Sequence, residues 1–176
     1  MDIANPITLA DQGKKEYEQE NYLAAADRFS QAAQAYALAK DQLNSSEMKN
    51  NQSVALLQAG KAKEALKATD GTEEIFQNAG DIRRQGIAVS NRAAALEGMK
   101  KWKEALAEYD RAALLFEQIG EGDMHSMVRK AAANLNLKRG RITDSQMDVF
   151  DSLRLVEKPT LTQRFMKFLM RIGFIK

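Results

Sequence analysis

Residues 93–116, AAALEGMKKWKEALAEYDRAALLF, contain the pattern that decides the fold of this chain. On both sides of Lys100-Lys101, small and large apolar residues recur three and four positions apart, which is the spacing of one face of an α-helix. The stretch therefore predicts two helices joined by a short turn. The first helix is expected from about Ile82 to Met99 and the second from about Trp102 to Gln118, with Gly120 closing the second as its C′ residue.

The same pattern returns at a constant interval along the chain. In this 40-residue period, Tyr22, Ala62, Trp102 and Ile142 are equivalent, as are Ala25, Ala65, Ala105 and Ser145, and Phe29, Thr69, Tyr109 and Val149. A fixed period of this length is the signature of a helical repeat protein. We predict an all-α solenoid of about four helix hairpins over residues 5–158, with units at about 6–43, 46–80, 81–120 and 121–157.

Local signals predict several helix ends. Asn5 followed by Pro6 is typical of a helix start, with asparagine as the cap and proline at the first helical position. Asp81 is expected to cap the helix that follows it. Thr143 with Gln146 forms a capping-box pattern, which predicts another helix start.

The second helix of the second unit is expected to be interrupted. Asp70-Gly71 falls inside it, and glycine weakens a helix by about 1 kcal/mol relative to alanine. Thr69 and Thr72 also replace the aromatic and small residues that the first and third units carry at these positions. We therefore predict a kink or break there.

The first and third units resemble the tetratricopeptide repeat family in their small and aromatic residues. Gly13, Tyr22, Ala25, Phe29 and Ala32 carry the resemblance in the first unit, and Ala93, Trp102, Ala105, Tyr109 and Ala112 in the third. The family's usual unit has about 34 residues, and this chain is similar to a longer variety with about 40 residues. An armadillo or HEAT array is the alternative that fits the period. Either one implies an α-solenoid whose neighbouring units bury each other's apolar faces.

Composition excludes several kinds of chemistry. The chain has 176 residues, no cysteine and one histidine, so thiol nucleophiles, zinc–thiolate sites and any site with two imidazoles are excluded. The histidine, His125, is expected at the surface. Neither the GxGxxG pattern nor the GxxxxGK pattern of phosphate-binding loops occurs. We therefore predict a protein that is not an enzyme and that binds no cofactor and no metal.

Charge and hydropathy bear on partners and location. The formal net charge is +2, and the positive excess lies at the C-terminus, in Lys158, Arg164, Lys167, Arg171 and Lys176. Because the rest of the chain is slightly acidic, we expect no nucleic-acid partner. There is no apolar run of membrane-spanning length and no secretory-signal pattern at the N-terminus. These features favour a cytoplasmic protein.

The family resemblance implies that the first helices of the units line a groove that binds a peptide or protein segment. The matching groove positions are Lys14 and Tyr17 in the first unit, Asn50, Asn51 and Leu57 in the second, Asn91 and Glu97 in the third, and Lys130 and Asn134 in the fourth. Asn51 and Asn91 occupy the same position in consecutive units, and an amide side chain can both donate to and accept from a peptide main chain. Helix packing is an equally supported role for these two asparagines. The prediction is a protein–protein interaction adaptor whose partner the sequence does not name.

Residues 160–176 predict a basic amphipathic C-terminal helix. At 100° per residue, one side carries Phe165, Phe168, Leu169 and Ile172, and the other carries Arg164, Lys167 and Arg171. Two interpretations remain open. The helix either caps the last repeat or contacts a membrane surface or a partner, including a second copy of the chain. Membrane contact would make the protein a peripheral scaffold at a membrane.

Overall fold

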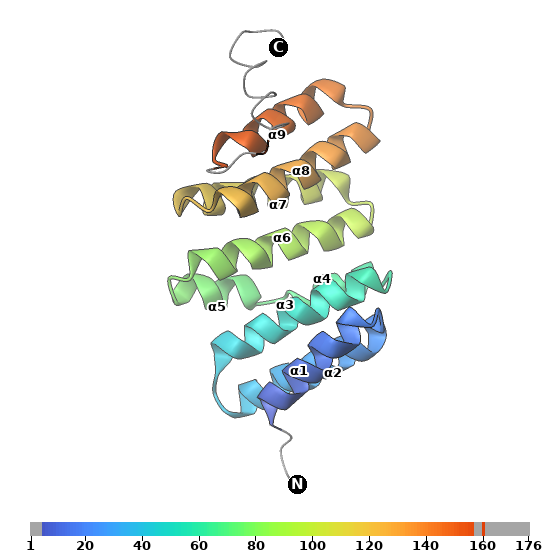
Figure 1. Cartoon of the computed structure of the whole chain (residues 1–176), viewed down its shortest axis with the longest axis vertical. Helices are drawn as coiled ribbons and strands as arrows, with labels where there is room; N and C mark the ends of the chain where they lie inside the picture. The colour runs from blue at the N-terminus through green and yellow to red at the C-terminus, as the bar shows by residue number, and fades with distance from the viewer. Residues whose placement is uncertain (1–4, 157–159, 161–176) are drawn as a thin grey trace.

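In the computed structural model, which describes residues 5–156 and Thr160, helices stack one above another along the long axis of the molecule (Figure 1). The nine helices of this part of the chain are α1 (Pro6–Glu18), α2 (Tyr22–Leu38), α3 (Gln42–Gln58), α4 (Ala62–Ala68), α5 (Thr72–Asn78), α6 (Ile82–Gly98), α7 (Trp102–Gln118), α8 (Gly122–Lys138) and α9 (Ile142–Arg154). Each packs on helices close to it in chain order. The predicted all-α solenoid arrangement is confirmed.

Turns of one kind separate the helices at a constant interval. The central residue of each has a positive φ, and these residues are Glu20, Lys40, Gly60, Gly80, Lys100, Gly120 and Gly140. After α6, the Lys100 N–H donates to the Glu97 carbonyl and the Lys101 N–H donates to the Leu96 carbonyl. This pair of bonds is a Schellman motif, which needs a left-handed residue after the helix. The repeated turn keeps the length of the repeat constant.

The turn at Lys40 corrects the predicted boundary between the first two units. We expected the first unit to end near residue 43 and the second to start near 46, but α3 already begins at Gln42. The reason is a cap: Oδ1 of Asp41 accepts a hydrogen bond from the Asn44 N–H at 3.0 Å.

Two of the predicted caps are present and one is not. Asn5 Oδ1 accepts from the Ile7 N–H at 2.9 Å, with Pro6 as the first helical residue. Asp81 Oδ1 accepts from the Arg84 N–H at 2.9 Å. The capping box at Thr143 is wrong. The helix α9 begins at Ile142, so Thr143 lies inside it rather than before it, and no side chain caps the helix.

The break in the second unit is confirmed. The helices α4 and α5 are separated by a turn at Gly71, whose φ is 74°. The two flanking threonines stabilise this turn. The Thr69 hydroxyl donates to the Leu66 carbonyl at 2.7 Å, and the Thr72 hydroxyl donates to the Thr69 carbonyl at 2.8 Å. Carbonyls near the break thus gain side-chain partners.

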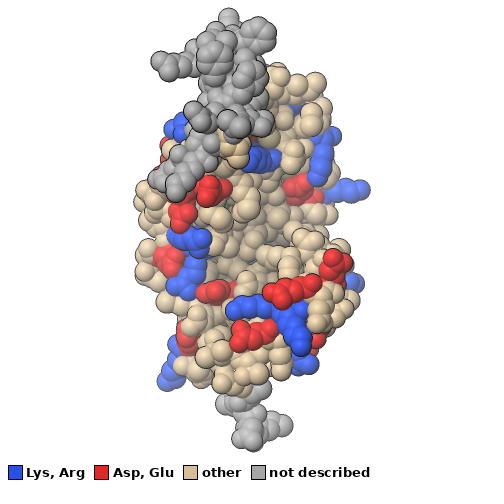
Figure 2. Space-filling view, viewed as in Figure 1, with Lys and Arg blue, Asp and Glu red and all other residues tan. Residues whose placement is uncertain are grey.

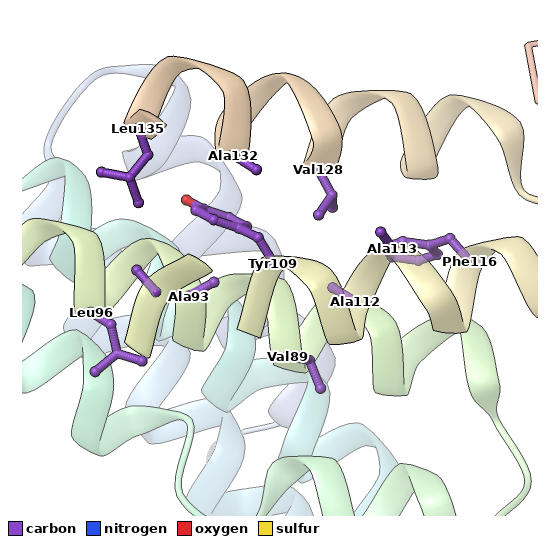
Figure 3. Packing of buried hydrophobic residues seen from close by; sticks show 11 residues of the cluster. Val89, Ala93, Leu96, Tyr109, Ala112, Ala113, Phe116, Val128, Ala132 and Leu135 are labelled. Atoms are coloured by element: carbon purple, nitrogen blue, oxygen red, sulfur yellow. The ribbon is translucent and has the colours of Figure 1, made fainter. Parts of the chain in front are cut away.

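The core is made of small residues that alternate with aromatic ones. In the third unit, Ala105 and Phe116 are fully buried and Tyr109 nearly so. Figure 3 shows side chains of α8, among them Val128 and Ala132, facing α7. A small residue is required opposite the ring of Phe116, because a β-carbon at Gly86 would lie only 2.8 Å from it. Close packing of this kind joins the two helices of the third unit, and α7 in turn packs on α8 of the next unit.

Candidate functional site

Two cavities lie on either side of α3, on the face formed by the first helices of the units. The cavity between α1 and α3 has a volume of about 270 Å³ and is lined by Lys14, Tyr17, Glu18, Phe29, Asn51 and Val54. The cavity between α3 and α6 has a volume of about 350 Å³ and is lined by Glu47, Asn50, Asn51, Phe76, Asp81, Arg83, Arg84 and Ile87. Asn51 lines both. Of the predicted groove residues of the first two units, Lys14, Tyr17, Asn50 and Asn51 line these cavities and Leu57 does not.

The cavity between α1 and α3, which we call the first cavity, has an apolar floor. The Phe29 ring can lie against α1 only because residue 13 is glycine, since a β-carbon there would be 2.7 Å from Cε1 of Phe29. Val54 adds a second apolar wall, and the Tyr17 ring meets the Tyr22 ring edge-on at 5.3 Å between centroids. An apolar side chain of a ligand fits such a floor.

The cavity between α3 and α6, the second cavity, is polar and its charges are already paired. The Arg84 guanidinium lies over the Phe76 ring, 5.3 Å from its centroid, and contacts Asp81 at 2.6 Å and Glu47 at 3.2 Å. Burial raises the pKa of Asp81, but hydrogen bonds from Arg84 outweigh it and hold that pKa below its usual value. The charge of Arg84 is therefore already paired within the protein.

Asn50, which lines the second cavity, has a buried side-chain oxygen without a partner within residues 5–156. Asn50 is 3% exposed, and among the described residues its Oδ1 accepts no hydrogen bond. A buried acceptor without a partner costs about 1–3 kcal/mol, so a donor that reached it would gain that energy back. The cavity is thus better suited to an N–H group than to an anion.

The remaining predicted groove residues line neither cavity. Leu57, near the end of α3, and Asn91 of α6 are half-buried, and Lys130 and Asn134 are exposed on α8. Glu97 is held within the protein, because it accepts a hydrogen bond from the Tyr109 hydroxyl at 3.0 Å and pairs with Lys138 at 2.9 Å. On the face seen in Figure 2, Lys and Arg side chains alternate with Asp and Glu.

The predicted membrane- or partner-contact residues, Arg164, Phe165, Lys167, Phe168, Leu169, Arg171 and Ile172, lie outside the described residues. Of the helices in residues 5–156, none combines the length and the hydropathy needed to cross a bilayer. In the same part of the chain, no three His, Asp or Glu side chains converge in a way that could hold a metal ion.

Sequence reasoning missed a charged network between α5, α6 and α7. Glu73 is 8% exposed, at a position where the first and third units carry alanine. Arg92 contacts both Glu73 and Glu108 at 2.8 Å, and Arg111 contacts Glu73 at 2.5 Å. Burial raises the pKa of Glu73, but the two arginines hold it below its usual value. In the sequence, the glutamate in place of alanine at position 73 was the sign of this network.

The prediction that His125 is a surface residue is wrong. His125 is fully buried between α8 and α9, at the position that Ser45 and Gln85 occupy in earlier units. Both of those residues are also buried, so the repeat alignment contained the signal. Burial lowers the pKa of His125, with Arg129 acting in the same direction and Asp151 against it.

Comparison of the sequence with known protein families and with curated proteins finds no match to either.

Proposed function

We propose that the chain is a non-enzymatic adaptor, similar to tetratricopeptide proteins, which holds an extended segment of a partner protein across its first helices. The observation that carries the proposal is that two cavities lie side by side and share Asn51. A half-buried amide between two cavities can pair with the ligand's main chain while its side chains enter the cavities on either side.

The spacing of the cavities suits an extended ligand. Packed helices lie about 8–10 Å apart, so the cavities on the two sides of α3 are separated by a similar distance. A polyproline II segment rises about 3.1 Å per residue with three residues per turn, so side chains three apart lie about 9 Å apart on one side. Residues i and i+3 of the ligand would enter the two cavities.

The cavity linings predict what those two residues are. The first cavity, floored by Phe29 and Val54, suits an aliphatic or aromatic side chain. The second cavity, with the unused Oδ1 of Asn50 and its arginines already paired, suits a side chain that bears an N–H group. An apolar residue and an amide or basic residue three positions apart are therefore the expected motif.

Selection of a displayed random-peptide library on the full chain tests this function. Selected peptides, made synthetically, should bind the Asn51→Ala/Asn91→Ala variant about tenfold or more weakly, because each lost main-chain pair costs about 0.5–1.5 kcal/mol. Gln34→Ala on the exposed surface of α2 is the control and should leave affinity unchanged. Equal affinity of the wild type and the double variant, with matching thermal melts, contradicts the proposal.

A further inference from the structure

The turns within the repeat units lie in a row along one edge of the stack (Figure 1). Neighbouring turns touch: a β-carbon at Gly98, the last residue of α6, would lie 2.8 Å from that of Ala62, the first residue of α4. Farther along the row, Lys138 Nζ lies 2.9 Å from the Glu97 carboxylate. This surface, which we call the turn edge, consists of residues 57–64, 97–104 and 137–144.

The turn edge carries an excess of positive charge. Its residues include eight Lys or Arg and four Asp or Glu, which gives a net charge of +4, although the whole chain has +2. The turns at the other end of the helices, in residues 37–44, 77–84 and 117–124, have three Lys or Arg and five Asp or Glu, which gives −2. Positive and negative charge are thus separated between the two ends of the helices.

Five cations of the turn edge are exposed and, within residues 5–156, form no ion pair. They are Lys61, Lys63, Lys100, Lys103 and Arg139. The other three cations of the edge are paired with its carboxylates. Because no carboxylate holds the five, their charge is available to a partner.

Exposed apolar side chains flank the cations of the last of these turns. Leu137 is 56% exposed and Ile142 is 60% exposed, on either side of Lys138, Arg139 and Arg141 in the chain. An aliphatic side chain in water gains free energy when a partner covers it. A surface that presents cations and apolar side chains together matches the interface of an anionic bilayer, which has charged headgroups above an apolar layer.

The kind of cation also favours a bilayer over a polyanion with fixed charges. Four of the five unpaired cations are lysines. Lysine is a compact charge on a flexible stem, whereas recognition of fixed phosphates or carboxylates typically uses the planar fork of arginine. Flexible charges suit lipid headgroups, which move freely within the bilayer plane. A nucleic-acid backbone would also give Leu137 and Ile142 no apolar cover.

We infer that the turn edge of the second, third and fourth units binds the surface of a bilayer that contains anionic lipids, with the unpaired lysines at the headgroups and Leu137 and Ile142 at the apolar boundary. The turn of the first unit, residues 17–24, carries two glutamates and no Lys or Arg, so the contact ends there. The helices would point away from the bilayer. Lys63 and Lys103 line neither cavity beside α3, so this contact is independent of the proposed function.

Co-sedimentation of the full chain with vesicles tests this contact. Each cation near an anionic bilayer strengthens binding about fivefold, so Lys63→Thr/Lys103→Thr should bind phosphatidylserine-containing vesicles about tenfold or more weakly than the wild type. The fourth unit carries threonine at this position, so thermal melts should match. The control, Lys40→Gly/Lys49→Gln, removes the same charge from outside the turn edge and should bind like the wild type. Residues 157–176 are identical in all three proteins.

Three results would overturn the inference. Equal losses in the two double variants would show that only the net charge of the chain matters. A wild type that does not bind these vesicles would show that the turn edge has no lipid partner. Binding of polyglutamate or duplex DNA in place of vesicles, with a loss in Lys63→Thr/Lys103→Thr, would identify a partner of another class.

The single tryptophan of the chain reports which end of the helices meets the bilayer. Trp102 lies in the turn edge, and energy transfer from its ring to a dansyl-labelled lipid falls steeply with distance. Helices of 17 residues are about 25 Å long, so Trp102→Phe/Leu38→Trp moves the donor to the far end. Transfer should be severalfold stronger in the wild type than in this variant, and equal transfer contradicts the proposed contact. None of these measurements involves the peptide site, so failure here leaves the proposed function separately testable.

Discussion

The Nε2 atom of His125 lies 3.4 Å from Oδ2 of Asp151, and the imidazole is wholly buried between α8 and α9. Its ring nitrogens have no hydrogen-bond partner among the described residues. Burial is the main reason that the pKa of His125 is lowered, and the attraction of Asp151 reduces the shift without cancelling it. The last described hairpin thus contains a base that folding keeps neutral.

Acidification should therefore destabilise the protein through His125. The unfolded chain takes up a proton there near pH 6.5, whereas the folded chain stays neutral to lower pH. The unfolded state then binds more protons, and the free energy of unfolding falls as the pH drops below about 6.5. Urea titrations at pH 7.5, 6.5 and 5.5 measure the slope.

A matched variant isolates this effect. His125→Gln, which installs the residue of the third unit, should flatten the pH dependence between 7.5 and 5.5. Burial raises the pKa of Asp148 above its ordinary value, so the folded chain takes up this proton at a higher pH than the unfolded chain and the carboxyl acts in the opposite sense. A wild-type slope that persists in the glutamine variant would assign the effect to another group.

The charged network at Glu73 should stabilise the junction of the second and third units. Glu73→Ala leaves Arg92 and Arg111 without their nearly buried partner, and we expect a loss of about 1–3 kcal/mol in the free energy of unfolding. Chemical denaturation measures it. The exposed neighbour Glu74 provides the control, because Glu74→Ala should change stability by less than about 0.5 kcal/mol.

A double variant tests whether the network acts as a unit. The first two units carry glutamine at the position of Arg92, so Glu73→Ala/Arg92→Gln restores the residues that other units use. This combination should recover part of the stability lost in Glu73→Ala, because the guanidinium that has lost one of its two carboxylate partners is removed as well. Strictly additive losses would mean that the two residues are not coupled.

The turn between α4 and α5 should tolerate asparagine better than alanine. A β-carbon at Gly71 would meet nothing within 4 Å, so the cost of Gly71→Ala comes from its φ of 74° alone. We expect a loss of about 1–2 kcal/mol for alanine and less for Gly71→Asn, since asparagine adopts the left-handed region more readily. Urea denaturation of both variants gives the comparison, and equal losses would point to a cause other than the backbone.

Gly122 should be the glycine least tolerant of substitution. The chain leaving α9 passes over the start of α8, and a β-carbon at residue 122 would overlap the backbone carbonyl of Leu155. Because backbone cannot rotate aside as a side chain can, Gly122→Ala should lower stability by about 1–3 kcal/mol. Asp123→Ala, one residue on and exposed, is the control in a thermal melt. A neutral Gly122→Ala would show that the chain takes another path after α9.

The periodic features of the fold could be predicted from the sequence, and the features that depend on single departures from the period could not. The spacing of Trp102 and Tyr109 placed α7, and Gly71 marked the break, because each acts through local backbone preferences. Lys40 and Lys100 adopt left-handed turns that lysine alone does not favour, but they share their register with glycines at 80 and 120 and at 60 and 140. The repeat register therefore marks these turns as well.

The candidate site also has some features that the sequence predicts and others that it does not. Lys14, Tyr17 and Asn51 line one cavity, because the repeat register places them on adjacent first helices. Two features could not be predicted. Asn50 Oδ1 has no hydrogen-bond partner among the described residues, and Glu97 accepts a hydrogen bond from the Tyr109 hydroxyl. They depend on which side chains of adjacent helices meet, and a single sequence does not specify those distances.

The even spacing of the left-handed turns has a consequence for how such a chain can change in length. Each turn lies half a repeat from the next, so duplicating any stretch one repeat long, wherever it begins, yields the same sequence of helices and turns. Among the described residues, units contact their neighbours along the stack, so the added copy creates one new junction, in which the helices meet at equivalent positions of the repeat. The gene encoding such a chain can therefore gain or lose repeats by recombination at many points and still encode a folded array.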